Sequence, residues 1–445
     1  MTLLEEARPQ AVRVRPRFDD VGFWLFVAGL LANCFAGHWS SLHVPVPIDR
    51  ALLLAGLALE WGRARRDGRR APLGTAAVLL LAFAVWTAIS FLGSPVRASD
   101  GLFFLVDLAV LPAVLFLSAP LVLDTARRRS AFAATFAVFG CYLGLTAITQ
   151  TLPLPALVFP AYILDPSVGI HADRARGPYA EAVNNGIMLV FSGALGGVTA
   201  ALAERRAWRV VGIAATLLTA VGCALTLTRA IWFGGAAALL VGVLLTPALR
   251  RRAPVVLVGL VAVAALFPLV FPGFGEAATT RGGDESPIWD RLNVNAAAAR
   301  MVVHDPLLGV GWNQAGERMS EFVRLGGDYP VTAASATLIP HNVFLGRFAE
   351  LGILGGSLWI AATIAAYVVP VLRRGRPGFA PWRVALLACT VCWVVVANFG
   401  PVNYSQPAYL LALVGGITAS GAAVRLPAHD WRPSPHRSLR GAHRG

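Results

Sequence analysis

The chain has 445 residues, of which 56% are apolar and only 14% are charged, and its mean hydropathy is +0.64. Because a soluble protein carries about a quarter of its residues as charged side chains, this composition excludes a soluble globular enzyme. All 38 basic residues are arginine and the net charge is +14. The absence of lysine excludes a P-loop ATP site, a pyridoxal Schiff base and a lysine nucleophile.

Apolar stretches long enough to be transmembrane helices, which need about 20 residues each, recur along the whole chain. They cover approximately residues 21–37, 46–62, 74–93, 102–122, 131–152, 183–203, 207–226, 230–248, 253–272, 342–371, 381–400 and 404–424. The second is the least apolar, because Asp49, Arg50 and Glu60 interrupt it. The pattern predicts an all-α polytopic membrane protein with about 12 transmembrane helices, nine within residues 21–272 and three within residues 342–425.

The arginines predict the orientation of the chain, because cytoplasmic loops of membrane proteins are enriched in Arg and Lys. With residues 1–20 in the cytoplasm, every predicted inner loop is basic. Membrane topology therefore accounts for the positive charge, and we expect the lipid bilayer as partner and no nucleic acid. The sequence predicts a multi-pass protein of the cytoplasmic (inner) membrane with both termini in the cytoplasm. Residues 426–445, rich in Pro, Arg and His, are expected to form a disordered cytoplasmic tail.

Two predicted outer segments, residues 153–182 and 273–341, are much longer than the other loops. Loops of this length in a compact protein are usually functional or disordered. The second contains a short amphipathic helix predicted near Asp290–His304, ended by Asp305-Pro306 and a turn at Gly309 and Gly311. We interpret residues 273–341 as a large extracytoplasmic catalytic loop.

Nine arginines lie in the predicted outer segments, where the charge bias does not explain them. They are Arg97, Arg174, Arg176, Arg229, Arg281, Arg291, Arg300, Arg318 and Arg324. Binding of a diphosphate requires several guanidinium groups on one side, because their planar forks match phosphate oxygens. The alternative is that these arginines are solvated separately or contact lipid headgroups.

Three of these arginines and one histidine occupy distinctive positions. Arg174 opens a polar segment directly before the sixth span, and Arg291 begins the loop helix. Arg229 lies between two spans with almost no loop, where a charge is costly unless it faces a polar cavity or a partner. His341 follows Pro340 at the start of the tenth span, where the helix dipole disfavours the imidazolium. A neutral imidazole there is a candidate general base or orienting group.

The tenth span contains two further features. Arg347 and Glu350 are three residues apart, which makes them natural ion-pair partners. Glu350 lies about 14 Å deeper than His341 by helical rise and on the opposite face, so the two cannot pair directly. Gly352 and Gly356 have the spacing of small residues at which another helix packs closely.

The sequence predicts no metal site and no redox site. It has no Asp-x-Asp, no His-x-x-x-His and no carboxylate cluster with ligand spacing. The five cysteines all fall in apolar stretches and are interpreted as core residues. We therefore expect no cofactor, and arginines would have to stabilise a leaving group by themselves.

Together these residues resemble the O-antigen ligase and O-antigen polymerase superfamily of bacterial membrane glycosyltransferases. The matching motifs are Arg174-x-x-Gly177, Thr228-Arg229-Ala230, and Arg291 followed by His304-Asp305-Pro306-Leu-Leu-Gly-Val-Gly311. The most specific one is His341-Asn342-x-Phe-Leu-x(4)-Glu350-Leu-Gly352-x-Leu-Gly355, and the motifs together cover about residues 170–360. Two departures are Thr228, where serine is often found, and Trp312, where a proline or another small residue is common.

The resemblance implies transfer of a glycan from undecaprenyl diphosphate to an acceptor hydroxyl at the outer membrane face, without nucleotide or metal. It also implies that Arg174, Arg229 and Arg291 hold the diphosphate and that His341 orients or deprotonates the acceptor. The predicted catalytic residues are thus His341, Arg291 and Arg229, and the predicted substrate-binding residues are Arg174, Arg176, Arg300, Asn342 and Glu350.

The sequence leaves the acceptor open between a glycan, a lipid and a protein. A ligase transfers one glycan block to an anchor, a polymerase joins repeat units, and a protein O-oligosaccharyltransferase modifies a polypeptide. The alternative from another class is a transporter or flippase for lipid-linked glycans. That function predicts ionisable residues deep within several spans and interrupted helices in matching halves, whereas this sequence has few such residues and no internal repeat.

Overall fold

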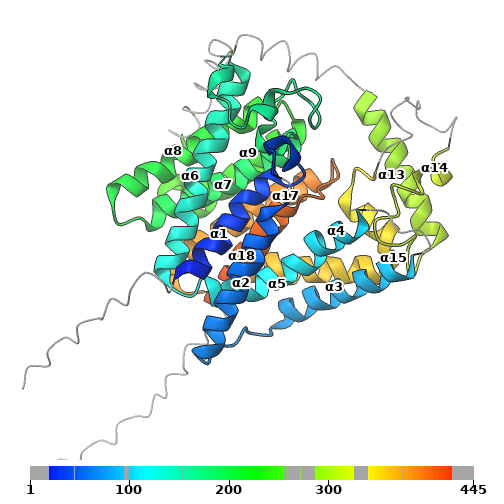
Figure 1. The fold of residues 1–445 in the computed structure, drawn as a ribbon, viewed down its shortest axis with the longest axis horizontal. Helices are drawn as coiled ribbons and strands as arrows, with labels where there is room; N and C mark the ends of the chain where they lie inside the picture. Colours follow the sequence, from blue (N-terminus) through cyan, green and yellow to red (C-terminus); the bar gives the residue numbers. More distant parts are fainter. Residues whose placement is uncertain are drawn as a thin grey trace, which may run out of the picture.

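The computed structural model describes residues 20–44, 46–94, 100–152, 154–254, 258, 271, 286–324, 339–373 and 375–422. Within these ranges every regular element is helical, which confirms the predicted all-α fold. Figure 1 shows long helices that cross one another at varied angles, with α13 and α14 set to one side of the bundle.

The helices before residue 152 form the first part of the bundle. They are α1 (Val21–Ala32), α2 (Ile48–Arg66), α3 (Thr75–Gly93), α4 (Gly101–Leu105), a π-helical segment η4 (Val106–Val110), α5 (Leu111–Val122) and α6 (Ala126–Thr151). α4, η4 and α5 are continuous, and α1 packs against α2. Short 3₁₀ turns follow α1 (Asn33–Phe35 and Ser40–Leu42) and α6 (Pro155–Leu157, Ala161–Leu164 and Gly177–Tyr179).

The later helices complete the bundle and the outer loop. They are α7 (Ala182–Leu202), α8 (Arg206–Leu225), α9 (Arg229–Leu245), α10 (Pro247–Arg251), α13 (Ser286–His304), α14 (Met319–Phe322), α15 (Val343–Thr363), a π-helical η9 (Ile364–Val368), α16 (Val369–Leu372), α17 (Ala380–Ala397) and α18 (Ser405–Ala422). A 3₁₀ turn at Pro377–Phe379 precedes α17. α18 is buried along most of its length and packs against α5 and α17.

Several of these helices are suited to cross a membrane. Among the described residues, seven are long and apolar enough: Thr75–Gly93, Gly101–Val122, Ala126–Thr151, Ala182–Leu202, Arg206–Leu225, Val343–Leu372 and Ala380–Ala397. The chain is therefore a polytopic membrane protein. The segment Val21–Phe35 and α9 are apolar but shorter. The predicted span at residues 253–272 lies almost wholly outside the described residues, so the total of twelve stays a prediction.

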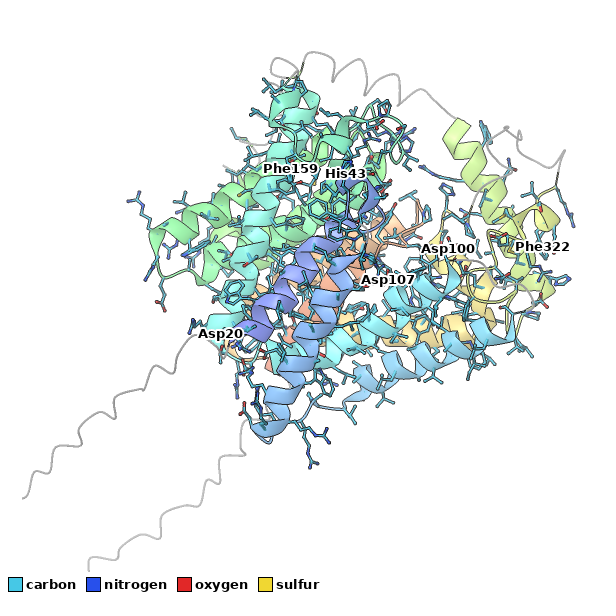
Figure 2. The ribbon with its side chains drawn as sticks, in the orientation of Figure 1. Asp20, His43, Asp100, Asp107, Phe159 and Phe322 are labelled. Atoms are coloured by element: carbon cyan, nitrogen blue, oxygen red, sulfur yellow. The ribbon has the colours of Figure 1, made fainter. Side chains whose placement is uncertain are left out.

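Ion pairs connect α6, α2 and the residue before α1 at one end of the bundle. Arg128 on α6 donates to Asp20 at 2.8 Å and to Glu60 on α2 at 2.7 Å. Arg63 on α2 also contacts Glu60, at 2.8 Å. Asp20 and His43 in Figure 2 mark the two ends of the α1–α2 region. Following the predicted orientation, we call the end with Asp20 the inner end and the end with His43 the outer end.

The loop helix α13 has an apolar face that packs at the outer end. Val294, Ala297, Ala298 and Met301 are fully buried and pack with Met319 of α14 and with α15. Their spacing of three and four residues places them on one side of the helix. A helix is thus found where one was predicted, and it begins at Ser286 and ends at His304. Its place in an extracytoplasmic loop stays a prediction.

α15 is interrupted at Gly352, which adopts φ +63° and ψ −172°. The turn Pro306–Gly311 fills the break with backbone hydrogen bonds. Val310 and Gly311 donate to the carbonyls of Ala349 and Glu350, both at 2.9 Å. Ile353 and Leu354 donate to the carbonyls of Pro306 and Leu307, at 2.8 and 3.5 Å. We call this exchange between residues 306–311 and 349–354 the α15 joint.

Two glycines, Gly309 and Gly352, make the α15 joint possible. The surroundings of Gly352 differ from those that the sequence predicted. A Cβ on Gly352 would lie 2.2 Å from the Leu307 carbonyl oxygen, and a Cβ on Gly309 would lie 2.4 Å from the Glu350 carbonyl carbon. The interpretation of Gly352 as a surface for packing another helix is therefore wrong. Its backbone conformation is open essentially to glycine alone, and what approaches it is the loop backbone.

Gly352→Ala should destabilise the folded protein. The residue would carry about 1–3 kcal/mol of backbone strain in addition to the clash with Leu307, so we expect a clearly lower melting temperature in detergent. The matched control is Gly197→Ala on α7, where a Cβ meets no atom within 4 Å and alanine favours the helix. A Gly352→Ala melting temperature equal to that of Gly197→Ala would contradict the role of the joint.

Candidate functional site

Three helices hold the backbone around Arg174 at the outer end. Gln150 of α6 donates to the Arg174 carbonyl at 2.8 Å. Asn185 of α7 donates to the Ala175 carbonyl at 2.9 Å, and the Ala175 N–H donates to Leu225 at the end of α8, at 3.2 Å. The segment that carries Arg174 is thereby tied to the turn that carries Arg229.

Arg229 is the first residue of α9 and follows a tight three-residue turn after α8. Leu227 in this turn has φ +48°, and the Thr228 hydroxyl donates to the Thr226 carbonyl at 2.9 Å. Only three residues separate the end of α8 from the start of α9. Arg229 is therefore held at the start of α9, at the end of the bundle that we call the outer end.

The guanidinium groups of Arg174, Arg229 and Arg291 are close enough to act on one another. The pKa of Arg291 on α13 is lowered, first by burial and then by the positive charges of Arg229 and Arg174. Burial also lowers the pKa of Arg174, Glu181 opposes this shift, and Arg229 adds to it. Three segments far apart in the sequence thus bring positive charge to one place. We call these three residues the arginine cluster.

The arginine cluster contains a donor that has no acceptor in the described part of the chain. The Nε atom of Arg174 is buried and unpaired, and so is the Oδ1 atom of Asn295, one helical turn after Arg291. A buried donor without an acceptor costs about 1–3 kcal/mol. Such a group, held beside two other cations, is suited to an anionic ligand.

A carboxylate faces the cluster from the start of α7. Glu181 caps this helix by accepting from the Val183 and Asn184 N–H groups, at 3.0 and 2.5 Å. Burial raises the pKa of Glu181, while these two bonds, a hydrogen bond from the Tyr404 hydroxyl and the charge of Arg174 oppose the shift. Tyr404 and Glu181 thus form a chain that leads to Arg174.

His341 precedes the first turn of α15. Its Nδ1 lies 2.9 Å from the Ile339 carbonyl oxygen. A carbonyl can only accept, so Nδ1 carries the proton, and in the neutral ring Nε2 carries the lone pair. Asn342 is the N-cap of α15: its Oδ1 accepts from the Leu345 N–H at 3.0 Å and its Nδ2 donates to Asn398 at 3.2 Å.

Glu350 and Arg347 form the ion pair expected from their spacing, with Nη1 and Oε2 2.7 Å apart. Arg347 also donates to Asn403 at 3.0 Å and lies over the Trp312 ring, 4.5 Å from its centroid. Trp312 is buried, and its indole N–H donates to the Gly101 carbonyl at 3.2 Å. This pair connects α15, the turn after α13 and the segment before α18.

Two of the predicted substrate-binding arginines are not brought into the cluster. Arg176 has an exposed fraction of 0%, and its guanidinium donates to the carbonyls of Ile163, Asp165 and Val168. Arg300 donates to the Phe322 carbonyl at 2.7 Å. These contacts hold the 161–168 segment and α14, respectively, which is a structural task that the sequence did not indicate.

A group of polar side chains at the start of α18 was not predicted. Asn403 bonds Arg347, Tyr404 bonds Glu181, Ser405 donates to Asn33 at 2.8 Å, Gln406 accepts from Tyr179, and Tyr409 donates to Asp107 at 2.7 Å. We call Asn403–Gln406 and Tyr409 the α18 hub. Its sequence signal is a run of four polar residues directly before an apolar span.

The α18 hub continues into a buried ionic network. Asp107, near the middle of the bundle in Figure 2, lies in the π-helical segment η4 and pairs with Arg50 at 2.5 Å. Asn33, the partner of Ser405, donates to Asp49 at 2.7 Å. The polar residues that made the second span weakly apolar are thus paired inside the protein. Among the described residues, no group of three or more His, Cys, Asp or Glu side chains has the geometry of a metal site.

Several apolar helices and three arginines brought together from distant segments are thus the features to compare with known proteins. The family model described as O-antigen ligase matches residues 214–360. This range includes Arg229, Arg291 and His341 and runs from within α8 into α15. The resemblance to the O-antigen ligase and O-antigen polymerase superfamily is thereby confirmed. No curated protein matches the chain.

The structure predicts different consequences for two neighbouring arginines. Arg176→Met should lower the melting temperature strongly, because the buried carbonyl of Ile163 and the partly buried carbonyls of Asp165 and Val168 lose a charged donor, at a cost of about 3 kcal/mol. Arg174→Met should leave the melting temperature unchanged or raise it, because it removes a cation from a cluster of like charges. Thermal unfolding of the two purified variants in detergent checks this, and equal losses would refute the distinction.

Proposed function

We propose that this protein transfers a glycan from undecaprenyl diphosphate to an acceptor hydroxyl during assembly of cell-surface polysaccharide. The reaction takes place at the extracytoplasmic face of the cytoplasmic membrane and uses neither a nucleotide nor a metal. The observation that carries this proposal is the arginine cluster, in which the positive charge of Arg229 helps to lower the pKa of both Arg174 and Arg291.

The electrostatics of the cluster support a diphosphate as its ligand. Like charges held together and partly buried destabilise one another, and a diphosphate removes that repulsion by supplying the opposite charge. The leaving group of the transfer is undecaprenyl diphosphate, whose negative charge grows as the bond to the sugar breaks. Guanidinium groups already in place stabilise this developing charge without reorganisation.

The proton transfer is assigned to His341. The acceptor hydroxyl oxygen attacks the anomeric carbon, the bond from that carbon to the diphosphate oxygen breaks, and the diphosphate keeps the electron pair. The hydroxyl proton passes to Nε2 of His341, whose Nδ1 proton is held by the Ile339 carbonyl. This carbonyl fixes the tautomer that a general base needs.

The donor reaches the site laterally from the bilayer, since its lipid chain stays in the membrane while the diphosphate enters at headgroup level. Incubation of the purified protein with a lipid-diphosphate glycan and candidate acceptors, followed by mass spectrometry of the products, tests the function. A ladder of products identifies a polymerase, and a single transfer to a separate glycan, lipid or protein identifies a ligase or an oligosaccharyltransferase. Absence of any transfer with all acceptors would overturn the proposal.

Arg229→Lys and His341→Ala should each lose transfer in that assay while the proteins remain folded. An ammonium cannot reproduce the two-pronged contact of a guanidinium with phosphate, and alanine removes the base. General-base catalysis contributes about 10²–10⁴-fold, so we expect a loss of that order for His341→Ala. The control is His304→Ala, because His304 is also an outer histidine and its ring is largely exposed. Wild-type rates in either test variant would exclude the corresponding role.

Tyr404→Phe should weaken donor binding by about 5–10-fold in kcat/KM, the equivalent of one hydrogen bond. Without the Tyr404 hydroxyl, Glu181 is less firmly held beside Arg174, so the effect should appear mainly in KM for the donor. Tyr409→Phe is the matched control, because it removes a phenol–carboxylate bond from the same hub but at Asp107. If both variants change KM alike, Tyr404 has no special relation to the arginine cluster.

A further inference from the structure

Large apolar side chains at the end of the outer loop helix and just after it are exposed. Val303 has an exposed fraction of 81%, Leu307 of 62% and Leu308 of 61%. The two leucines belong to the turn Asp305–Gly311, which we call the leucine turn. In water, each of these side chains would give up about 1.5–3 kcal/mol that burial provides, so an apolar surrounding is expected.

The leucine turn is continuous with an exposed face of α15. Ile353 and Leu354 are 48% and 51% exposed, on a helix that is long and apolar enough to span the membrane. The α15 joint connects them to Pro306 and Leu307 through backbone hydrogen bonds. The exposed leucines of the turn therefore extend an exposed apolar face of α15, which we expect to face lipid.

The backbone of the leucine turn is paired in part. Among the described residues the N–H groups of Leu307 and Leu308 donate to no backbone carbonyl, so the turn suits the membrane interface rather than the hydrocarbon interior. Irregular backbone is tolerated at membrane depth only where its polar groups are paired. In this turn Gly309 donates to Asp305 at 3.0 Å, and Val310 and Gly311 donate to the carbonyls at the break in α15. The joint thus satisfies donors of the loop and acceptors of the broken helix at the same time.

Helical geometry places the joint at the outer boundary of the hydrocarbon or inside it. From Leu372, which precedes Arg373, back to Gly352 is about 20 residues, or about 30 Å at 1.5 Å per residue. This equals the thickness of the hydrocarbon core, about 30 Å. Any tilt of the helix moves Gly352 deeper, because more residues are then needed to cross.

Charged and polar side chains lie next to the leucine turn. His304 contacts Asp305 at 2.9 Å, and Arg318 lies 3.7 Å from Asp305 and 2.9 Å from Glu321. Charged side chains beside exposed leucines are typical of an element that lies at a membrane interface. The geometry points to insertion of the leucine turn into the outer leaflet, with acyl chains covering Val303, Leu307 and Leu308.

Insertion has a consequence for the arginine cluster. α13 carries Arg291, and its last turn leads directly into the leucine turn. A turn fixed in the outer leaflet therefore holds this helix at headgroup level, where the phosphates of a lipid-linked substrate lie. This inference concerns the position of the loop in the membrane and does not depend on the reaction that the site performs.

Site-directed spin labelling of the full chain tests the insertion. After replacement of the five native cysteines by alanine, a nitroxide is attached at L307C or L308C, and the protein is placed in nanodiscs of phosphatidylethanolamine and phosphatidylglycerol. We expect both labels to collide with apolar oxygen more than with the water-soluble nickel chelate. L354C on α15 is the lipid-facing control, and E321C on α14, with its side chain 53% exposed, is the aqueous control. Labels at 307 and 308 that behave like E321C would overturn the proposal.

A second measurement keeps the native cysteines and so does not rely on a multiply substituted protein. In intact membranes, a membrane-impermeant maleimide should modify E321C rapidly and L307C slowly, and detergent should abolish the difference. The unmodified chain gives the background from Cys34, Cys141, Cys223, Cys389 and Cys392, which are buried or partly buried. Modification of L307C as fast as E321C before detergent is added would refute insertion.

Discussion

The outer half of this protein depends on the α15 joint. Four backbone hydrogen bonds connect the turn after α13 to the two halves of α15, and each is worth about 0.5–1.5 kcal/mol net. These bonds matter more than that figure indicates. In a membrane, leaving one of these backbone groups unpaired would cost more free energy than the hydrogen bond contributes. The joint fixes the helix that carries Arg291 against the helix that follows His341. The turn after α13 and the helix α15 are thereby held together as one structural unit.

The arginine cluster lowers the stability of the folded protein, and the diphosphate that we propose as its ligand accounts for this arrangement. Like charges and an unpaired Nε at Arg174 oppose folding, and such local conflicts are expected where a site awaits a ligand. The surrounding structure offsets them. Glu181 supplies a compensating charge, Gln150 and Asn185 hold the backbone, and the α18 hub holds Glu181 through Tyr404. The same segments therefore give both rigidity and charge balance to the outer end.

The sequence predicted well what depends on local pattern and less well what depends on contacts between distant segments. Hydropathy located the helices, and the residues Arg174, Arg229 and Arg291 were identified before the structure placed them together. The role of Arg176 was not predictable, because its acceptors are carbonyls of residues 163–168 that form no recognisable motif. The break at Gly352 was missed because a glycine in an apolar stretch looks the same whether a helix or a loop backbone approaches it. The α18 hub was missed because hydropathy averages four polar residues into the neighbouring span.

The break in α15 also bears on the choice between the proposed transferase and a transporter for lipid-linked glycans. In transporters, interrupted helices present free backbone carbonyls and N–H groups that bind the substrate or its coupling ion. Here the carbonyls of Ala349 and Glu350 and the N–H groups of Ile353 and Leu354 are already bonded to the protein's own turn. At the inner end, Arg128 bonds Asp20 and Glu60 and so connects α6 to the segment before α1 and to α2. Within the described residues, the paired backbone groups at the break and the ion pairs at the inner end support the proposed transfer at one face of the membrane over passage across it.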